Sequence, residues 1–226
     1  MGTRSAYATG QIHAWRGNFG RQYTDRNDYS PAALDEFYQQ TYGIARRHLN
    51  ELFLQRVPKR ARILEVGCNM GTQLLILQEM GFTNLHGIEI QSYALEKARL
   101  RLPGVRLLQA SALAIPYPDA YFDLVFTSGV LIHIAPNDLS VAMYEIHRCA
   151  KQWIWGFEYY APEITAINYR GQENLLWKAD YSRMYVDCFA DLEKEKGQRL
   201  YYRQNANEDS MFLLRRKPKS ECQERR

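Results

Sequence analysis

The sequence predicts an α/β fold in which a mostly parallel sheet carries helices on both faces and ends in an antiparallel hairpin. Between residues 31 and 158, short apolar runs alternate with segments of helical apolar spacing, which is typical of successive strand–helix–strand units. The runs are largely apolar throughout, as expected for strands covered on both faces. Two further apolar runs near the C-terminus, separated by polar turn formers, predict the hairpin.

Boundary residues define the elements in order along the chain. Ser30 can cap a helix that opens with Pro31, and Pro58 ends it. Gly67 and Gly81 flank the next helix. We expect helices at residues 31–56, 74–80, 92–102, 138–150 and 181–192. We expect strands at residues 62–66, 84–89, 105–109, 122–126, 153–157, 200–202 and 211–214.

One domain accounts for the length of the chain. The 226 residues, 46% of them apolar, can bury a sizeable core. We expect a single domain over residues 1–217, with an irregular, aromatic segment at 1–30 and a basic tail at 218–226. No apolar run reaches the roughly 18 residues of a membrane span, and the N-terminus lacks the apolar core of a signal peptide, so we expect no membrane contact.

The four cysteines are scattered, and none forms a C-x-x-C pair. They predict neither a disulfide framework nor a zinc site, and no other cluster of metal ligands is apparent. We therefore expect a reduced, cytoplasmic protein without a bound metal.

The net charge of +4 lies in the C-terminal tail. Residues 215–226 hold six Arg or Lys and two Glu, which leaves 23 basic and 23 acidic residues in the rest of the chain. A nucleic-acid-binding protein needs a basic face on its folded body, so this balance argues against a nucleic-acid partner.

A glycine loop, Glu65-Val66-Gly67-Cys68-Asn69-Met70-Gly71, lies where the first strand turns into a helix. Its glycines allow close approach of the backbone to a ligand, and the helix N-terminus offers free N–H groups. The G-x-x-x-G spacing matches neither the dinucleotide loop nor the nucleoside triphosphate loop. Glu89 ends the second strand, where a carboxylate can accept both hydroxyls of a ribose. These features predict a ligand site at the carboxyl ends of the strands.

Four motifs in this order resemble those of the class I S-adenosylmethionine-dependent methyltransferases. They are the glycine loop, the acid that ends the second strand, residues 109–112 after the third strand and residues 118–134 around the fourth. Over residues 12–217 the chain also resembles the methylases associated with pseudaminic acid biosynthesis, through residues 15–27, 129–134, 169–171 and 208–214. The resemblance implies a Rossmann-like seven-stranded sheet, S-adenosylmethionine as cofactor, and a small-molecule acceptor such as a sugar or sugar nucleotide.

The resemblance also implies roles for individual residues. Glu89 would hold the ribose, and Glu65 would anchor the loop or the amino group of the cofactor. Ser111 stands where the family usually has an acid, and Cys68 stands where it usually has Ala or Gly. The residues expected to bind the cofactor are Tyr23, Arg26, Glu65, Gly67, Cys68, Asn69, Gly71, Glu89, Ile90, Ser111, Ala112, Leu113, Ser128 and Gly129.

Three further features carry both a functional and a structural interpretation. His133 follows the fourth strand and could take a proton from the acceptor, or it could be an ordinary buried histidine. The aromatic segment at 1–30 could close over the site as a lid, or it could only cover an edge of the core. Tyr159, Tyr169 and Arg170 are candidates for the acceptor site, although Arg170 could be a surface residue in a turn.

The prediction is an enzyme that transfers a methyl group to an oxygen or nitrogen of a small molecule, with His133 as the candidate general base. Two further interpretations stay open: a nucleic-acid or protein methyltransferase, and a cofactor-binding scaffold without activity. The stretch at 127–130 lacks the Asn/Asp-Pro-Pro-aromatic motif of amino-directed base methylases, which argues against a nucleic-acid acceptor.

Overall fold

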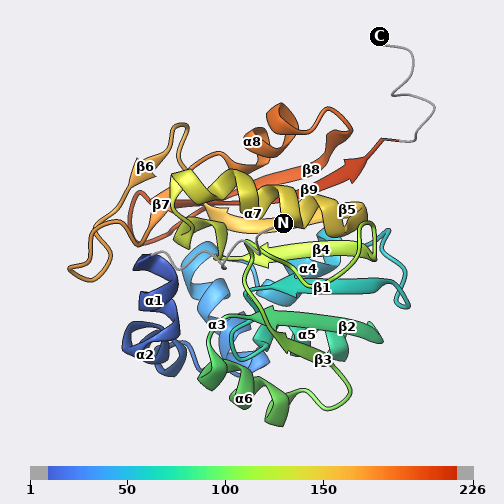
Figure 1. The fold of residues 1–226 in the computed structure, drawn as a ribbon, viewed down its shortest axis with the longest axis horizontal. Helices are drawn as coiled ribbons and strands as arrows, with labels where there is room; N and C mark the ends of the chain where they lie inside the picture. Colours follow the sequence, from blue (N-terminus) through green and yellow to red (C-terminus); the bar gives the residue numbers. More distant parts are fainter. Residues whose placement is uncertain (1–9, 218–226) are drawn as a thin grey trace, which may run out of the picture.

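A seven-stranded sheet forms the centre of the protein, whose residues 10–217 are described by a computed structural model (Figure 1). The strands are β1 (Arg62–Val66), β2 (Asn84–Glu89), β3 (Arg106–Gln109), β4 (Phe122–Ser128), β5 (Ala150–Tyr159), β8 (Leu192–Tyr201) and β9 (Glu208–Arg216). Their order across the sheet is β3-β2-β1-β4-β5-β9-β8. Strands β1 to β5 are parallel, and β9 is antiparallel to both β5 and β8. The predicted fold class is confirmed.

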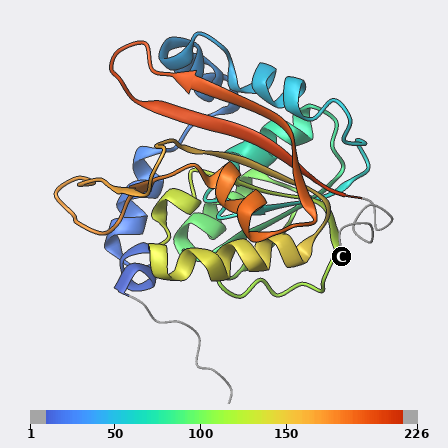
Figure 2. The ribbon, with the colours of Figure 1, turned by 90° about the horizontal axis from the view of Figure 1, so that it is seen from above.

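Helices cover both faces of this sheet (Figures 1 and 2). They are α1 (Gly10–Arg16), α2 (Asn18–Arg26), α3 (Pro31–Tyr42), α4 (Arg46–Phe53), α5 (Thr72–Glu79), α6 (Ser92–Arg101), α7 (Pro136–Cys149) and α8 (Tyr181–Cys188). Helices α3 to α6 pack on one face through an apolar cluster that contains Leu49 and Trp155. Helices α7 and α8 pack on the other face through a second cluster that contains Ile146 and Tyr185.

Residues 10–16 and 18–26 are helical, which corrects the prediction of an irregular segment at 1–30 for these residues, whereas residues 1–9 lie outside the described part of the chain. Helices α1 and α2 are seven and nine residues long and are joined at Gly17. Their aromatic residues make tertiary contacts: Trp15 lies 5.2 Å from Phe19 and 5.1 Å from Tyr23 between ring centroids. Helices this short are marginal alone, so packing stabilises them more than local propensity does. A sequence pattern of so few residues could not reveal them.

The single helix predicted for residues 31–56 is two helices. Gly43 has a left-handed backbone (φ +81°) and ends α3, and its N–H donates to the carbonyl of Gln39. Helix α4 begins three residues later at Arg46. The apolar spacing continued across the break, which explains why the two helices read as one.

The C-terminal strands are longer than predicted. Strand β8 begins at Leu192, whereas the predicted strand begins at residue 200. The prediction missed the first part because β8 is an edge strand whose charged residues hide the apolar pattern. Helix α8 therefore ends at Cys188, before the predicted end at 192. A small two-stranded sheet, β6 (Thr165–Ala166) with β7 (Trp177–Lys178), lies between β5 and α8 in the chain and was not predicted.

The predicted basic tail at 218–226 lies outside the described residues. Among residues 10–217, no helix has the length and apolar character needed to cross a bilayer.

Candidate active site

A pocket of about 380 Å³ opens at the carboxyl ends of the parallel strands. This volume lies within the range typical of small-molecule sites. The wall combines loops after β1, β2, β3 and β4 with side chains from α1, α2, α3 and the β5–β9 edge. Fifteen of the eighteen residues predicted for the site line it: Tyr23, Glu65, Gly67, Cys68, Asn69, Glu89, Ile90, Ser111, Ala112, Leu113, Ser128, Gly129, His133, Tyr159 and Tyr169.

Three predicted residues lie outside the pocket lining. Arg26 is exposed at the end of α2. Gly71 faces α6: a Cβ placed on it would lie 2.1 Å from the Cδ1 atom of Leu102. Arg170 is exposed in a turn with a left-handed backbone (φ +54°), so the structural interpretation of this arginine fits its position.

The glycine loop is tied to the neighbouring strand. The N–H groups of Gly67 and Cys68 both donate to the carbonyl of Ile88, at 2.8 and 3.0 Å. Gly67 has φ +71°, and a Cβ there would lie 2.7 Å from Val130. Only glycine fits without displacing Val130, so the loop after β1 packs directly on the loop after β4.

Glu89 links the glycine loop to the end of β2. Its Oε2 atom accepts from the N–H of Asn69 at 2.9 Å, and its Oε1 atom accepts from the N–H of Gln91 at 2.9 Å. Burial raises the pKa of Glu89, and these backbone hydrogen bonds oppose the increase. Each carboxylate oxygen keeps a second lone pair for a further donor.

Glu65 is buried behind the loop at 3% exposure. Its Oε2 atom has no hydrogen-bond partner within residues 10–217. Burial raises the pKa of Glu65 well above its usual range, while the positive charge of Arg46 opposes the increase. A buried acceptor left unpaired is costly, so this oxygen suits a donor supplied by a ligand.

Arg46 is a buried cation that the sequence analysis did not identify. Its Nη1 atom donates to the hydroxyl of Tyr38 at 2.8 Å and to the hydroxyl of Ser128 at 3.3 Å. The guanidinium carbon also lies 4.7 Å from the ring centroid of Phe157. Arg46 thus fixes the end of β4 from the side of α4.

Glu158 is a second buried carboxylate that the sequence analysis missed. It accepts from the N–H of Val130 at 3.0 Å and from that of Ile132 at 3.3 Å, and so holds the loop after β4. Burial raises the pKa of Glu158 to about 7.

His133 lines the pocket from the short 3₁₀ turn at Leu131–His133. Its Nδ1 atom lies 2.7 Å from the carbonyl of Leu175, which requires a hydrogen on Nδ1 and leaves Nε2 as an acceptor in the neutral ring. Burial lowers the pKa of His133 to about 4. The ring centroid lies 4.5 Å from that of Trp15, which lines the pocket from α1.

Ser111 has a structural role in its own turn. Its hydroxyl accepts from the N–H of Leu113 at 3.1 Å, in the loop after β3. Its hydroxyl hydrogen can still donate to another group.

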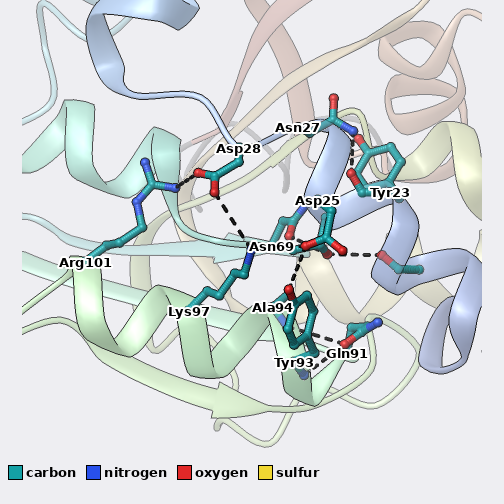
Figure 3. Close-up of polar contacts among 12 residues, drawn as sticks. Tyr23, Asp25, Asn27, Asp28, Asn69, Gln91, Tyr93, Ala94, Lys97 and Arg101 are labelled. Atoms are coloured by element: carbon teal, nitrogen blue, oxygen red, sulfur yellow. Dashed lines mark hydrogen bonds and ion pairs between the residues drawn. The ribbon is translucent and has the colours of Figure 1, made fainter.

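Hydrogen bonds and ion pairs join helix α2, and the residues just after it, to helix α6 beside the pocket (Figure 3). Asp25 accepts from the hydroxyl of Tyr93 at 2.7 Å and from the Nζ atom of Lys97 at 3.1 Å. The Nη1 atom of Arg101 lies 3.3 Å from Asp28. On the pocket side, the Thr24 hydroxyl donates to the side chain of Asn69 at 3.0 Å. We call the contacts of Asp25 and Asp28 with α6 the α2–α6 latch.

The far end of the pocket holds a group that we call the tyrosine cluster: Tyr38, Tyr42, Tyr159, Tyr202 and Asp209. Only Tyr159 was predicted. Asp209 is fully buried and accepts a hydrogen bond from the hydroxyl of Tyr42. The cluster combines three distant chain segments, so no local pattern could have identified it.

Comparisons with known proteins agree with this geometry. Residues 64–153 match the family model described as a methyltransferase domain. The chain is 30% identical over 169 residues to a malonyl-[acyl-carrier protein] O-methyltransferase of Halorhodospira halophila. This alignment covers 73% of the chain and 55% of the relative. The chain is also 33% identical over 81 residues to a trans-aconitate 2-methyltransferase of Rhizobium rhizogenes. This alignment covers 35% of the chain and 31% of the relative. Residues 64–153 are thus similar to a methyltransferase domain.

The fold of the chain has solved counterparts. A 1,6-didemethyltoxoflavin-N1-methyltransferase of Burkholderia thailandensis, with 1,6-didemethyltoxoflavin and S-adenosylhomocysteine bound, superposes with a TM-score of 0.71. The superposition covers 96% of this chain and 94% of that protein at 15% identity, which shows a shared fold. The sequence matches span 31% to 55% of the length of the four relatives found.

The pocket fits S-adenosylmethionine, the cofactor that the family match indicates. The unpartnered oxygen of Glu65 suits an ammonium group. The remaining lone pairs of Glu89 suit a pair of hydroxyls. Both carboxylates lie in the lining on either side of the glycine loop.

Proposed function

We propose that this protein transfers a methyl group from S-adenosylmethionine to an oxygen or nitrogen atom of a small molecule. One observation carries the proposal: a single pocket joins the glycine loop and Glu89 at one end to the tyrosine cluster at the other. A cofactor and an acceptor bound at these two ends would meet beside Ser128 and Gly129. Holding two reactants in line can contribute on the order of 7–11 kcal/mol to lowering the barrier.

The residues at the loop end would hold the cofactor. Glu89 would accept the ribose hydroxyls, and Glu65 would accept from the amino group. Ile90 and Leu113 would border the adenine. When bound, the cofactor supplies an electrophilic methyl group on a positively charged sulfur. The chain itself would position the reactants and exclude water.

Water exclusion is the role we propose for α1 and α2. Trp15 and Tyr23 line the pocket and pack around His133 at ring-centroid distances of 4.5 and 5.9 Å. Phe19 reaches Tyr169 of the β6–β7 connection, with ring centroids 6.0 Å apart. These contacts cover the pocket from two sides, as expected of a lid.

The acceptor we propose is a small molecule rich in hydroxyl groups, such as a sugar or a sugar nucleotide. The tyrosine cluster supports this choice, because its phenol groups and Asp209 can both donate and accept hydrogen bonds. The sequence resemblance over residues 12–217 supports it as well. The name of one relative, a malonyl-[acyl-carrier protein] O-methyltransferase, favours an oxygen acceptor. The name of the other, a trans-aconitate 2-methyltransferase, favours a small organic molecule.

Two measurements test the proposed function. Isothermal titration of the purified protein with S-adenosylhomocysteine should give saturable binding at one site. Mass spectrometry of small-molecule extracts, incubated with the protein and methyl-labelled S-adenosylmethionine, should reveal a product that carries the label. Binding without any labelled product would favour an inactive cofactor-binding scaffold. In a parallel incubation with whole-cell extract, label in protein or nucleic acid would favour a macromolecular acceptor.

A further inference from the structure

Asp209 occupies a defined position relative to the end of β4. Ser128 pairs with Phe157 of β5, and Tyr159 pairs with Asp209 of β9. Asp209 is thus two strands and two residues away from Ser128, or about 12 Å between Cα atoms at standard sheet spacings. The step of two residues runs toward the carboxyl end of β5, where the pocket opens.

The two oxygens of Asp209 have different surroundings. Oδ2 accepts from the hydroxyl of Tyr42, and the side chain of Tyr202 also donates to this carboxylate. Oδ1 is buried without a hydrogen-bond partner among the described residues. A buried acidic group with a free oxygen and two phenol donors is equipped to take up a proton.

Charged and titratable groups surround Asp209 on every side. They are Tyr38 and Tyr42 on α3, Arg46 on α4, Tyr159 on β5, Lys178 on β7 and Tyr202 after β8. Burial raises the pKa of Asp209 to about 7, although hydrogen bonds from Tyr42 and Tyr202 and the positive charges of Lys178 and Arg46 oppose the increase. Burial also raises the pKa of Tyr42, which therefore stays protonated.

We propose that Tyr42 takes the proton of the methyl acceptor and passes its own proton to Asp209. This inference rests on the proposed function and deepens it: the acceptor is a molecule whose O–H or N–H group contacts the Tyr42 hydroxyl. Tyr42 is then a catalytic residue, and Asp209 acts through it.

The proton balance of this step is complete. The acceptor atom uses a lone pair to form its bond to the methyl carbon, and the electron pair of the broken S–CH₃ bond stays on sulfur. The O–H or N–H bond of the acceptor breaks, its electron pair stays on the acceptor atom, and its proton goes to the Oη atom of Tyr42. The original hydroxyl proton of Tyr42 moves to Oδ2 of Asp209, which becomes a neutral acid.

His133 is less suited to this task, although it lines the same pocket. Its pKa, lowered by burial to about 4, makes it a weak base at neutral pH. Its Nε2 lone pair can instead accept a hydrogen bond from a bound molecule.

A titration experiment tests the proton-accepting carboxylate without any acceptor. Protein labelled with ¹³C at aspartate carboxyls is titrated by NMR in the presence of S-adenosylhomocysteine. We expect one carboxyl with a midpoint near 7 that disappears in Asp209→Asn and moves to higher pH in Tyr42→Phe, because a hydrogen bond that favours the ionised form is lost. An Asp209 signal with an ordinary midpoint, or one that Tyr42→Phe leaves in place, would overturn the proposal.

A kinetic experiment tests the role of Tyr42. Alcohols, phenols and primary amines are offered with methyl-labelled S-adenosylmethionine, and these probes distinguish an oxygen from a nitrogen acceptor. We expect Tyr42→Phe to lower kcat by about 10²-fold or more, with the KM of the acceptor little changed, and to remove the rise of kcat/KM with pH near 7. Tyr201→Phe is the matched control, since Tyr201 is 64% exposed and lies outside the pocket lining.

The outcomes separate the two proposals. If wild-type protein does not bind S-adenosylhomocysteine, the proposed function fails. If it binds and methylates a probe while Tyr42→Phe keeps the rate and the pH dependence, only the proton route fails. If no probe is methylated, the NMR titration decides.

Discussion

The carboxylate of Glu89 accepts a hydrogen bond from the backbone N–H of Asn69 at an N···O distance of 2.9 Å. This contact joins the end of β2 to the glycine loop after β1, so the candidate ribose ligand also shapes the loop beside it. Asn69 has a left-handed backbone (φ 46°), and its side chain accepts from Thr24 of α2. Hydrogen bonds therefore connect Glu89, the glycine loop and helix α2.

Replacing Glu89 by Ala should weaken S-adenosylhomocysteine binding by about 1.5–3 kcal/mol, because charge-assisted hydrogen bonds to the ribose are lost. Isothermal titration calorimetry measures the change. Glu96→Ala is the matched control, since Glu96 is exposed on α6, outside the pocket lining, and its loss should leave the affinity unchanged. Equal affinity of Glu89→Ala and wild type would remove Glu89 from the cofactor site.

Replacing Gly67 by Ala should lower the affinity for S-adenosylhomocysteine more than tenfold (about 1.4 kcal/mol or more). The added Cβ would lie 2.7 Å from Val130 and push the two pocket loops apart. Gly81→Ala is the control, because Gly81 has a similar backbone (φ +89°) and nothing within 4 Å of the added atom. Both variants should lose about 1–2 kcal/mol of stability from the left-handed conformation, but only Gly67→Ala should lose binding. Calorimetry and urea unfolding measure the two effects.

The sequence predicted the parts of the site that are local in the chain. Gly67 and Glu89 lie at strand ends, and one short motif identifies each of them. Asp209 could not be predicted in this way, because its partner Tyr42 is 167 positions away. The roles of Arg46 and Glu158 could not be predicted either, because they come from tertiary contacts. Arg46 contacts Ser128, and Glu158 contacts the loop at Val130. Strand periodicity predicts which face is buried, but it does not reveal which polar side chains meet there.

The same limit applies to the fold. Apolar strands predicted the sheet, since covered strands keep a continuous apolar run whatever lies beside them. The short helices α1 and α2 depend on packing against the pocket, and their sequence carried only an aromatic bias. The apolar pattern continues across Gly43, although this residue ends helix α3. The pattern could not reveal the break, because the break depends on the left-handed backbone of a single residue.

Replacing Asp25 by Asn should speed the release of S-adenosylhomocysteine by a factor of about two to five, because the α2–α6 latch loses its ion pair with Lys97. Both side chains are partly exposed, so the effect should shrink as salt is added. Stopped-flow tryptophan fluorescence, to which Trp15 of α1 contributes, measures the rate. Asp187→Asn, which breaks a remote exposed pair with Arg183 on α8, should leave the rate unchanged. A salt-independent change, or an equal change in both variants, would contradict the latch.

Glu158 should make the protein less stable as the pH rises from about 5 to 7.5. Its pKa is about 7 in the folded state and near 4.5 when unfolded, so the folded state binds the extra proton between these values. The stabilisation is complete below the unfolded pKa and is lost as the pH rises through the folded pKa, a loss on the order of 3 kcal/mol for this group. Asp209 contributes with the same sign, since its pKa is also raised to about 7. Urea unfolding should therefore show a shallower pH dependence in Glu158→Gln, while the exposed Glu163→Gln should follow wild type. A Glu158→Gln slope equal to that of wild type would mean that this carboxylate titrates outside the interval.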